Sequence, residues 1–142
     1  MGSDGGRPTL RLSLSAVPRE VRSALMDLRA ALAADLDEEC LATVETVLAE
    51  VLNNIAEHAY RDLGGPVSLL MQRDAAGLRF RVLDRGQPMP RGALPEGNPP
   101  TDVDPLPEGG FGWFLIRRLT TELEYRREPD GNLLLFCIPV KQ

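Results

Sequence analysis

The sequence predicts an α+β fold, in which one mixed, mostly antiparallel sheet is covered on one face by helices. The first observation behind it is periodicity, because some segments alternate apolar and polar residues while others place apolar residues at steps of three and four. The second is their order, which runs strand, helix, helix, strand, strand, loop, helix, strand, strand. With 142 residues, the chain is expected to form a single domain over residues 9–142, after a flexible leader at residues 1–8.

A strand and two long helices are expected in the first part of the chain. Leucines alternate with polar side chains in residues 9–15, as in a strand with one buried face. Pro18 suits the first turn of a helix that runs to about residue 35. Asp37 is a suitable cap for the next helix, which is expected to end near Arg61. This second helix has one apolar stripe, formed by Leu41, Val44, Leu48, Val51 and Ile55.

Two hairpins and a third helix are expected in the rest of the chain. Alternating strands at residues 67–72 and 78–83 flank a turn that ends in Gly77. The closing hairpin joins residues 121–127 to residues 133–140 through a Pro-Asp-Gly turn. A short apolar helix is expected at residues 113–119, just before this hairpin, and the glycine cluster at residues 109–112 opens it.

A proline-rich loop without periodicity is expected at about residues 86–110. A loop of this length inside a compact domain is more often a lid or a binding loop than filler. Its apolar residues suit a partner contact, a fold over a ligand or a mobile loop; they are Met89, Leu94, Val103 and Leu106.

Composition and charge exclude several classes of protein. A net charge of -5 argues against a general binder of nucleic acids or of anionic membranes, which requires a basic patch. No apolar run approaches the roughly 20 residues of a membrane span, and the N-terminus lacks the pattern of a signal peptide. Cys40 and Cys137 lack metal-ligand spacing, so reduced thiols of a cytoplasmic protein are expected, with a disulfide as the alternative.

A polar row runs beside the apolar stripe of the second long helix. Glu50, Asn54 and His58 are spaced four residues apart and therefore lie on one side of that helix. Asparagine is a poor helix former, and the pair Asn53 and Asn54 stands in the middle of the helix. A solvated polar face explains Glu50 taken alone, whereas the complete row favours a functional site.

Each of three segments has a chemical interpretation and a structural one. Glycines before a helix, as at Gly110 and Gly112, let backbone amides approach an anion, although glycines also simply end loops. Asp84, followed by Gly86, is able to accept a hydrogen bond from a ligand amine, although Asp-x-Gly turns are common. Asn54 offers a neutral oxygen ligand for Mg²⁺, and Glu50 is placed one turn earlier to accept a proton.

The three segments resemble the N box and the two glycine boxes of the histidine-kinase-like ATPase superfamily. They comprise residues 50–60, which contain Glu50, Asn54 and a His-Ala-Tyr ending, residues 84–86, and residues 109–119 with the strand that follows. Within this superfamily, the chain most resembles the anti-sigma factor serine/threonine kinases, which are bacterial regulators that switch partners. The resemblance covers most of the chain beyond residues 1–8.

The resemblance implies the two-layer α/β sandwich of these ATPases and a kinase that uses ATP and Mg²⁺. It implies phosphorylation of a serine on an anti-anti-sigma protein, binding of a sigma factor or other regulator, a homodimer, and a cytoplasmic location. By position, Glu50 is the catalytic base, Asn54 binds Mg²⁺ within the nucleotide site, and Asp84 reads adenine. The remaining nucleotide-binding positions are Gly86, which allows close approach, and Gly110, Phe111 and Gly112, where the two glycines cradle phosphates.

The chain departs from the family pattern at three positions. Pro88 replaces the second glycine of the first box, Glu108 stands where some members have a basic residue, and Asn132 replaces a common threonine. Such changes affect the rate of phosphate transfer more than nucleotide binding. The alternative is a non-catalytic partner-binding module of the same fold, with weak or no nucleotide binding.

Overall fold

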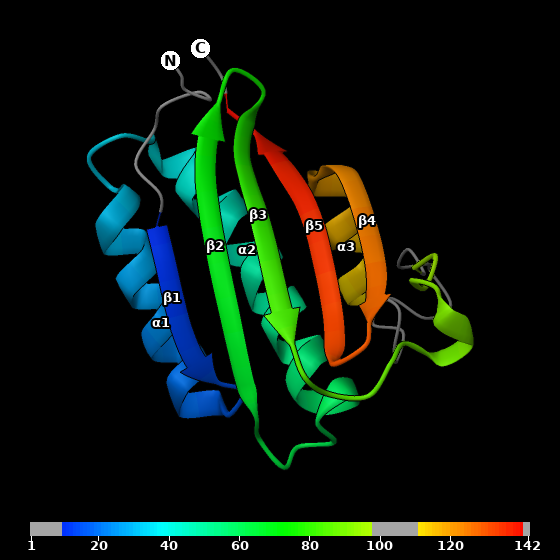
Figure 1. Cartoon of the computed structure of the whole chain (residues 1–142). Coiled ribbons are helices and arrows are strands. Elements are labelled where there is room, and N and C mark those ends of the chain that lie inside the picture. Colours follow the sequence, from blue (N-terminus) through cyan, green and yellow to red (C-terminus); the bar gives the residue numbers. More distant parts are fainter. Residues whose placement is uncertain (1–9, 98–110, 141–142) are drawn as a thin grey trace, which may run out of the picture.

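The protein is an α+β sandwich of two layers, in which three helices cover one face of an antiparallel sheet (Figure 1). This computed structural model describes residues 10–97 and 111–140. Within these ranges the sheet has five strands in the order β1-β2-β3-β5-β4. The strands are β1 (Leu10–Ser15), β2 (Pro66–Asp74), β3 (Gly77–Asp84), β4 (Thr121–Glu128) and β5 (Gly131–Pro139).

Every neighbouring pair of described strands is antiparallel, so the expected mixed sheet is corrected to an antiparallel one. The reason lies in the place of β5. The pairings make β3 and β4 run in the same direction, as the helix between them requires, but β5 lies between these two strands and opposes both. The prediction of helices on one face is confirmed, and no described element covers the other face (Figure 1).

The first two helices begin where the sequence predicts, and the third begins two residues before the expected residue 113. Pro18 occupies the first turn of α1 (Pro18–Leu32), and the side chain of Asp37 caps α2 (Glu38–Asn54) by accepting a hydrogen bond from the backbone N–H of Cys40 at 2.8 Å. The second helix continues as a π-helical turn, η1 (Ile55–Ala59), which the sequence analysis treats as ordinary helix. The third helix, α3 (Phe111–Leu119), precedes β4.

The core lies between the sheet and α2, which packs between α1 and α3 (Figure 1). Val47, Leu48 and Val51 of α2 are at most 1% exposed, and they belong to the same core as Phe80 of β3 and Ile116 of α3. Burial of this stripe fixes the rotation of α2 about its axis. The side of α2 with Glu50 and Asn54 therefore faces the start of α3.

The first part of the expected lid is packed against the domain. Its described residues include a short 3₁₀ turn, η2 (Pro90–Gly92). Met89 and Leu94 are partly buried against the core, and the side chain of Arg117 in α3 donates a hydrogen bond to the Pro95 carbonyl at 2.9 Å. These two apolar residues are therefore packing contacts rather than free partner contacts. The rest of the expected lid, with Val103, Leu106 and Glu108, and the expected leader lie outside the described residues.

Two further expectations concern the whole chain. Cys40 and Cys137 are both free thiols, the first half-buried and the second buried, as the sequence predicts. Among residues 10–97 and 111–140, no helix combines the length and the apolar character that crossing a membrane requires.

Candidate functional site

The polar row of α2 ends in a distorted turn. The side-chain amide of Asn54 donates a hydrogen bond to the backbone carbonyl of Glu50 at 2.9 Å, one turn earlier. The backbone of the next residues forms η1, in which the N–H of Tyr60 bonds to the carbonyl of Ile55 at 3.0 Å. Side-chain bonds of this kind compete with the helical pattern, and single π-helical turns occur frequently at functional sites.

The end of η1 contacts the turn that follows β3. The hydroxyl of Tyr60 donates to the Pro66 carbonyl at 2.6 Å and accepts from the backbone N–H of Arg85 at 2.7 Å. The backbone N–H of Gln87 bonds to the Ala59 carbonyl at 2.8 Å. A Cβ atom at Gly86 would lie only 2.5 Å from the same Ala59 oxygen, so only glycine fits there without displacing backbone. The absence of a side chain at Gly86 therefore lets the end of η1 pack against this turn. The expected contact of Gly86 with nucleotide stays a prediction.

Asp84 lies at the end of β3 on the covered face of the sheet and is only 4% exposed. Its Oδ1 atom accepts hydrogen bonds from the backbone N–H of Gly86 at 2.8 Å and from the side chain of Asn132 at 2.9 Å. Burial raises the pKa of the Asp84 carboxyl, although these two bonds and the charge of Arg127 oppose the increase. The Oδ2 atom has no partner within the described part of the chain, so this buried acceptor is available to a ligand.

Asn132 of β5 is the centre of a hydrogen-bond network beside Asp84. Its Nδ2 donates to Asp84 and to the Gln87 carbonyl at 2.8 Å, while its Oδ1 accepts from the Tyr125 hydroxyl at 2.6 Å and from Arg127 at 3.2 Å. From the sequence, Asn132 is only a departure from the family pattern, and Tyr125 and Arg127 are not predicted as site residues. The available signal was strand register, because Asn132 pairs directly with Asp84 across β3 and β5.

The start of α3 lies against the polar row of α2. A Cβ atom at Gly112 would be 2.4 Å from Glu50 Oε1 and 3.6 Å from Asn54 Nδ2. The structure thus brings the second glycine segment together with the row in α2. Partial burial, and secondarily the charge of Glu57, raises the pKa of Glu50. Phe111 stacks on Phe114 with ring centroids 6.0 Å apart. Gly110 lies outside the described residues.

Asn54 and Asp84 line one cavity of about 210 Å³. Its walls are mainly apolar, and Trp113, Met89 and Ile55 contribute to them. Such a concave, apolar site with few polar groups is typical of small-molecule binding. His58, Arg61 and Pro88 also line it, whereas Glu50, Gly86, Phe111 and Gly112 do not form its lining.

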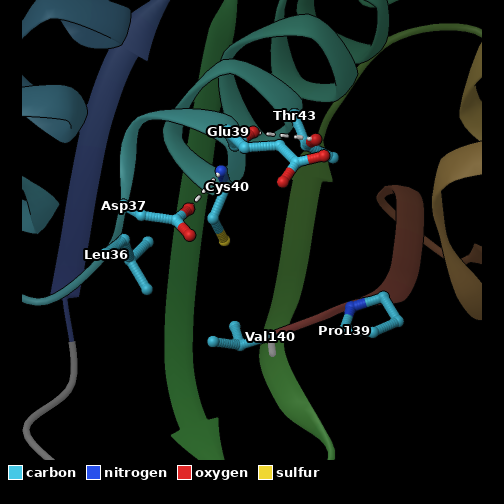
Figure 2. Close-up of a pocket in the computed structure, with 7 residues that line it drawn as sticks. All are labelled: Leu36, Asp37, Glu39, Cys40, Thr43, Pro139 and Val140. Atoms are coloured by element: carbon cyan, nitrogen blue, oxygen red, sulfur yellow. Dashed lines mark hydrogen bonds between the residues drawn. The ribbon is translucent and has the colours of Figure 1, made fainter. Parts of the chain in front are cut away.

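A second cavity, of about 150 Å³, lies at the other end of α2 (Figure 2). Two of its polar side chains form hydrogen bonds within α2. Asp37 caps the helix, and the Thr43 hydroxyl donates to the Glu39 carbonyl at 3.1 Å. It contains none of the predicted site residues, two of which, Asn54 and Asp84, line the other cavity. Within residues 10–97 and 111–140, no cluster of three or more His, Cys, Asp and Glu residues is placed to hold a metal ion.

Comparison with known proteins agrees with the sequence resemblance. Residues 14–138 match the family model described as the histidine kinase-like ATPase domain. The serine-protein kinase RsbW of Halalkalibacterium halodurans is 33% identical over 95 residues, which are 64% of this chain and 57% of that relative. The chain thus matches little more than half the length of this kinase. Since the family model extends from β1 to β5, the chain belongs to the histidine kinase-like ATPase family.

Proposed function

We propose that the protein is an ATP-dependent serine/threonine kinase and anti-sigma factor. In this proposal it phosphorylates a serine of an anti-anti-sigma protein and sequesters a sigma factor or another regulator. The observation that carries the proposal is the shared cavity, which is lined by both Asn54 and Asp84 although 30 positions separate these residues in the chain. The start of α3 at Gly112 packs against the side of α2 that has Glu50 and Asn54.

Asp84 is suited to recognise the base of the nucleotide. Its Oδ2 atom, which has no partner among the described residues, is a buried acceptor that matches the exocyclic amino group of adenine. The apolar walls around Trp113 and Met89 suit an aromatic base. Binding of adenine would give the Oδ2 atom of Asp84 the hydrogen-bond donor that the described residues do not supply.

Asn54 is suited to hold Mg²⁺ near the phosphates. Its amide nitrogen bonds to the Glu50 carbonyl, and its oxygen has no partner among the described residues, so the oxygen is available to a cation. Mg²⁺ prefers oxygen ligands, takes few of them from the protein, and neutralises phosphate charge when bound. Gly112 would then lie near the phosphates, and the roles of Gly110 and Phe111 remain predictions.

Glu50 is assigned as the catalytic base. Its raised pKa brings the carboxyl closer to the pH at which proton transfer is effective. In the transfer, the serine oxygen bonds to the γ-phosphorus, the bond from that phosphorus to the ADP oxygen breaks, and Glu50 accepts the hydroxyl proton. Partial burial beside Gly112 limits the access of water to this carboxylate.

The choice of partner rests on similarity. The relative from Halalkalibacterium halodurans is named a serine-protein kinase, which supports a serine as phosphate acceptor. A homodimer and a cytoplasmic location belong to the same proposal, as do the anti-anti-sigma protein and the sigma factor.

A second candidate is a partner-binding module without catalysis. Pro88 favours it, since this residue lines the cavity at the position of a family glycine and has no backbone N–H to donate. This candidate needs only the fold and a surface for a regulator, and it predicts weak or absent nucleotide binding.

One experiment separates the two candidates. The purified protein is mixed with Mg-ATP and a candidate anti-anti-sigma protein, and phosphoserine is measured by mass spectrometry beside calorimetry with Mg-ATP alone. The kinase proposal predicts binding and transfer, with transfer lost in Glu50→Ala while binding remains. Unchanged transfer in that variant would remove Glu50 from the chemistry, and no heat at millimolar nucleotide would favour the module.

A further inference from the structure

We infer that Asn132 is a positioning residue that keeps Asp84 as a hydrogen-bond acceptor and ties it to the base of the loop after β3. One amide would thereby determine both the choice of nucleobase and the placement of the loop. The part on nucleobase choice rests on the proposed nucleotide site. The part on the loop concerns the protein without any ligand.

Asn132 has no hydrogen-bonding capacity left for a ligand. An asparagine amide has two N–H donors and an oxygen with two lone pairs. Both donors are used, by Asp84 Oδ1 at 2.9 Å and by the Gln87 carbonyl at 2.8 Å. The oxygen accepts from the Tyr125 hydroxyl at 2.6 Å and from Arg127 at 3.2 Å. The residue is 6% exposed, so turning the amide around would leave these buried groups unpaired.

This orientation fixes what the cavity presents to a ligand. Because the amide N–H groups are committed, the polar atom at this place that has no partner among the described residues is Asp84 Oδ2, which is an acceptor. An acceptor pairs with the 6-amino group of adenine and repels the 6-oxo group of hypoxanthine or guanine. ATP and ITP differ at this position of the base, so their affinity ratio measures the contact.

The same amide anchors the chain on both sides of Pro88. On one side Asn132 donates to the Gln87 carbonyl. On the other, the Tyr125 hydroxyl that donates to Asn132 also accepts from the backbone N–H of Met89 at 3.0 Å. The backbone N–H of Gln87 is held separately by the Ala59 carbonyl, which makes it an internal control.

The test uses Asn132→Asp and Tyr125→Phe as a matched pair. Asn132→Asp keeps an oxygen toward Tyr125 and Arg127 but removes both donors and puts a second carboxylate beside Asp84. Tyr125→Phe removes the hydroxyl that holds Met89 and leaves the bond between Asn132 and Asp84 in place. Both variants are first checked for folding by circular dichroism, and Asn132→Thr replaces Asn132→Asp if the latter does not fold.

In the ligand-free protein, residue-resolved hydrogen exchange measures how firmly the backbone amides of Met89 and Gln87 are held. Tyr125→Phe should exchange the Met89 amide about tenfold faster or more, as expected when a hydrogen bond of about 1.4 kcal/mol is lost. Asn132→Asp should also speed this exchange, because it loses the bond from Asn132 to the Gln87 carbonyl. The Gln87 amide in Tyr125→Phe should remain at the wild-type rate. An unchanged Met89 rate in Asn132→Asp would overturn the anchoring of the loop by Asn132.

The ratio of the affinities for ATP and ITP measures the contact between Asp84 and the base. The wild type should prefer ATP over ITP, and Tyr125→Phe should still prefer ATP, because it keeps the bond between Asn132 and Asp84. Asn132→Asp should lower it by roughly tenfold or more, because two adjacent carboxyl groups share a proton and then offer a donor as well as an acceptor. A wild-type ratio in Asn132→Asp would overturn the role in base selection. If the wild type binds no nucleotide while Met89 exchange responds as expected, the proposed function fails and the anchoring of the loop stands.

Discussion

The side-chain amide of Asn54 donates a hydrogen bond to the backbone carbonyl of Glu50 at 2.9 Å, and this bond fixes the orientation of the amide. One of its two N–H donors is thereby engaged, and its oxygen, which has no partner among the described residues, is available to the cavity that Asn54 lines. The two residues proposed for metal binding and for proton transfer are therefore linked through the backbone of one helical turn. The bond also stands where α2 passes into η1.

Replacing Asn54 by alanine should remove the dependence of nucleotide binding on Mg²⁺. The variant loses the amide oxygen, so its affinity for Mg-ATP should fall by roughly tenfold or more, as for a lost ligand to a charged group. Calorimetry with and without EDTA checks this, because EDTA should weaken binding by the wild type but not by Asn54→Ala.

His58→Ala is the matched control for that experiment. His58 lines the same cavity from the same polar row, but it is exposed, with 65% of its side chain accessible, and has no assigned role. It should bind Mg-ATP within about threefold of the wild type, the spread expected of a surface substitution. Equal losses in both variants would mean that Asn54 acts through general disturbance of the helix end.

Glu50→Gln should separate chemistry from binding. The substitution keeps shape but removes the proton acceptor, so phosphate transfer should fall by about 10²-fold or more while ATP affinity changes little. Single-turnover transfer and calorimetry on the same preparation check the two quantities. Equal loss of both would indicate that Glu50 has a binding role instead.

Glu57→Gln should shift the pH profile of transfer without abolishing it. The Glu57 charge is the smaller of the two causes that raise the pKa of Glu50, after burial. Without this charge, the pKa of Glu50 falls, and the carboxylate stays ionised to lower pH. The acid limb of the transfer profile should therefore move to lower pH. A shift toward higher pH, or none, would contradict the assignment of that limb to Glu50.

Two glycine substitutions should have opposite signatures. In Gly112→Ala, the new Cβ meets the end of the flexible Glu50 side chain at 2.4 Å, so the fold should remain while transfer falls. In Gly86→Ala, the new Cβ meets the Ala59 backbone oxygen at 2.5 Å, so the free energy of unfolding should fall by about 1–3 kcal/mol. Urea unfolding and transfer rates measured on both variants check this contrast. An unstable Gly112→Ala together with a stable Gly86→Ala would contradict it.

Asp84→Asn should weaken nucleotide binding and should not lower the free energy of unfolding at neutral pH. Burial raises the pKa of Asp84 in the folded state, so folding favours the protonated form. The stability that protonation contributes is fully present below the unfolded pKa of about 3.9 and is lost as pH rises through the folded pKa. At neutral pH the buried charge therefore costs stability, and the neutral amide should be at least as stable as the wild type.

Urea unfolding at pH 7 and near pH 4 checks the Asp84→Asn prediction. The stability difference should be largest at pH 7 and should shrink toward pH 4, where the wild-type carboxyl also becomes neutral. A variant that is less stable than the wild type at pH 7 would show that the bonds from Gly86 and Asn132 outweigh the cost of burial.

The layered fold was predictable from sequence because its signals are local. The Asp37 cap and the alternation in β3 depend on neighbouring residues, and both are confirmed. The π-helical turn was not predictable, since consecutive asparagines indicate strain in a helix but do not specify the hydrogen-bond pattern that relieves it.

The candidate site was predictable only in part. Its motif residues were found, but the network around Asn132 depends on β3 and β5 being in register and on β4 lying beyond β5. The reason for glycine at position 86 was also hidden, because the atom that excludes a side chain belongs to Ala59, far away in sequence. Met89 and Leu94 pack against the core without any periodicity that could have indicated it.

The most direct test is a titration of the protein with Mg-ATP, followed by tryptophan fluorescence. Trp113 is the only tryptophan of the chain and lines the cavity shared by Asn54 and Asp84. The account predicts a saturable change in the wild type that is absent or strongly weakened in Asp84→Asn. No change at millimolar Mg-ATP, or equal binding by the wild type and Asp84→Asn, would contradict it.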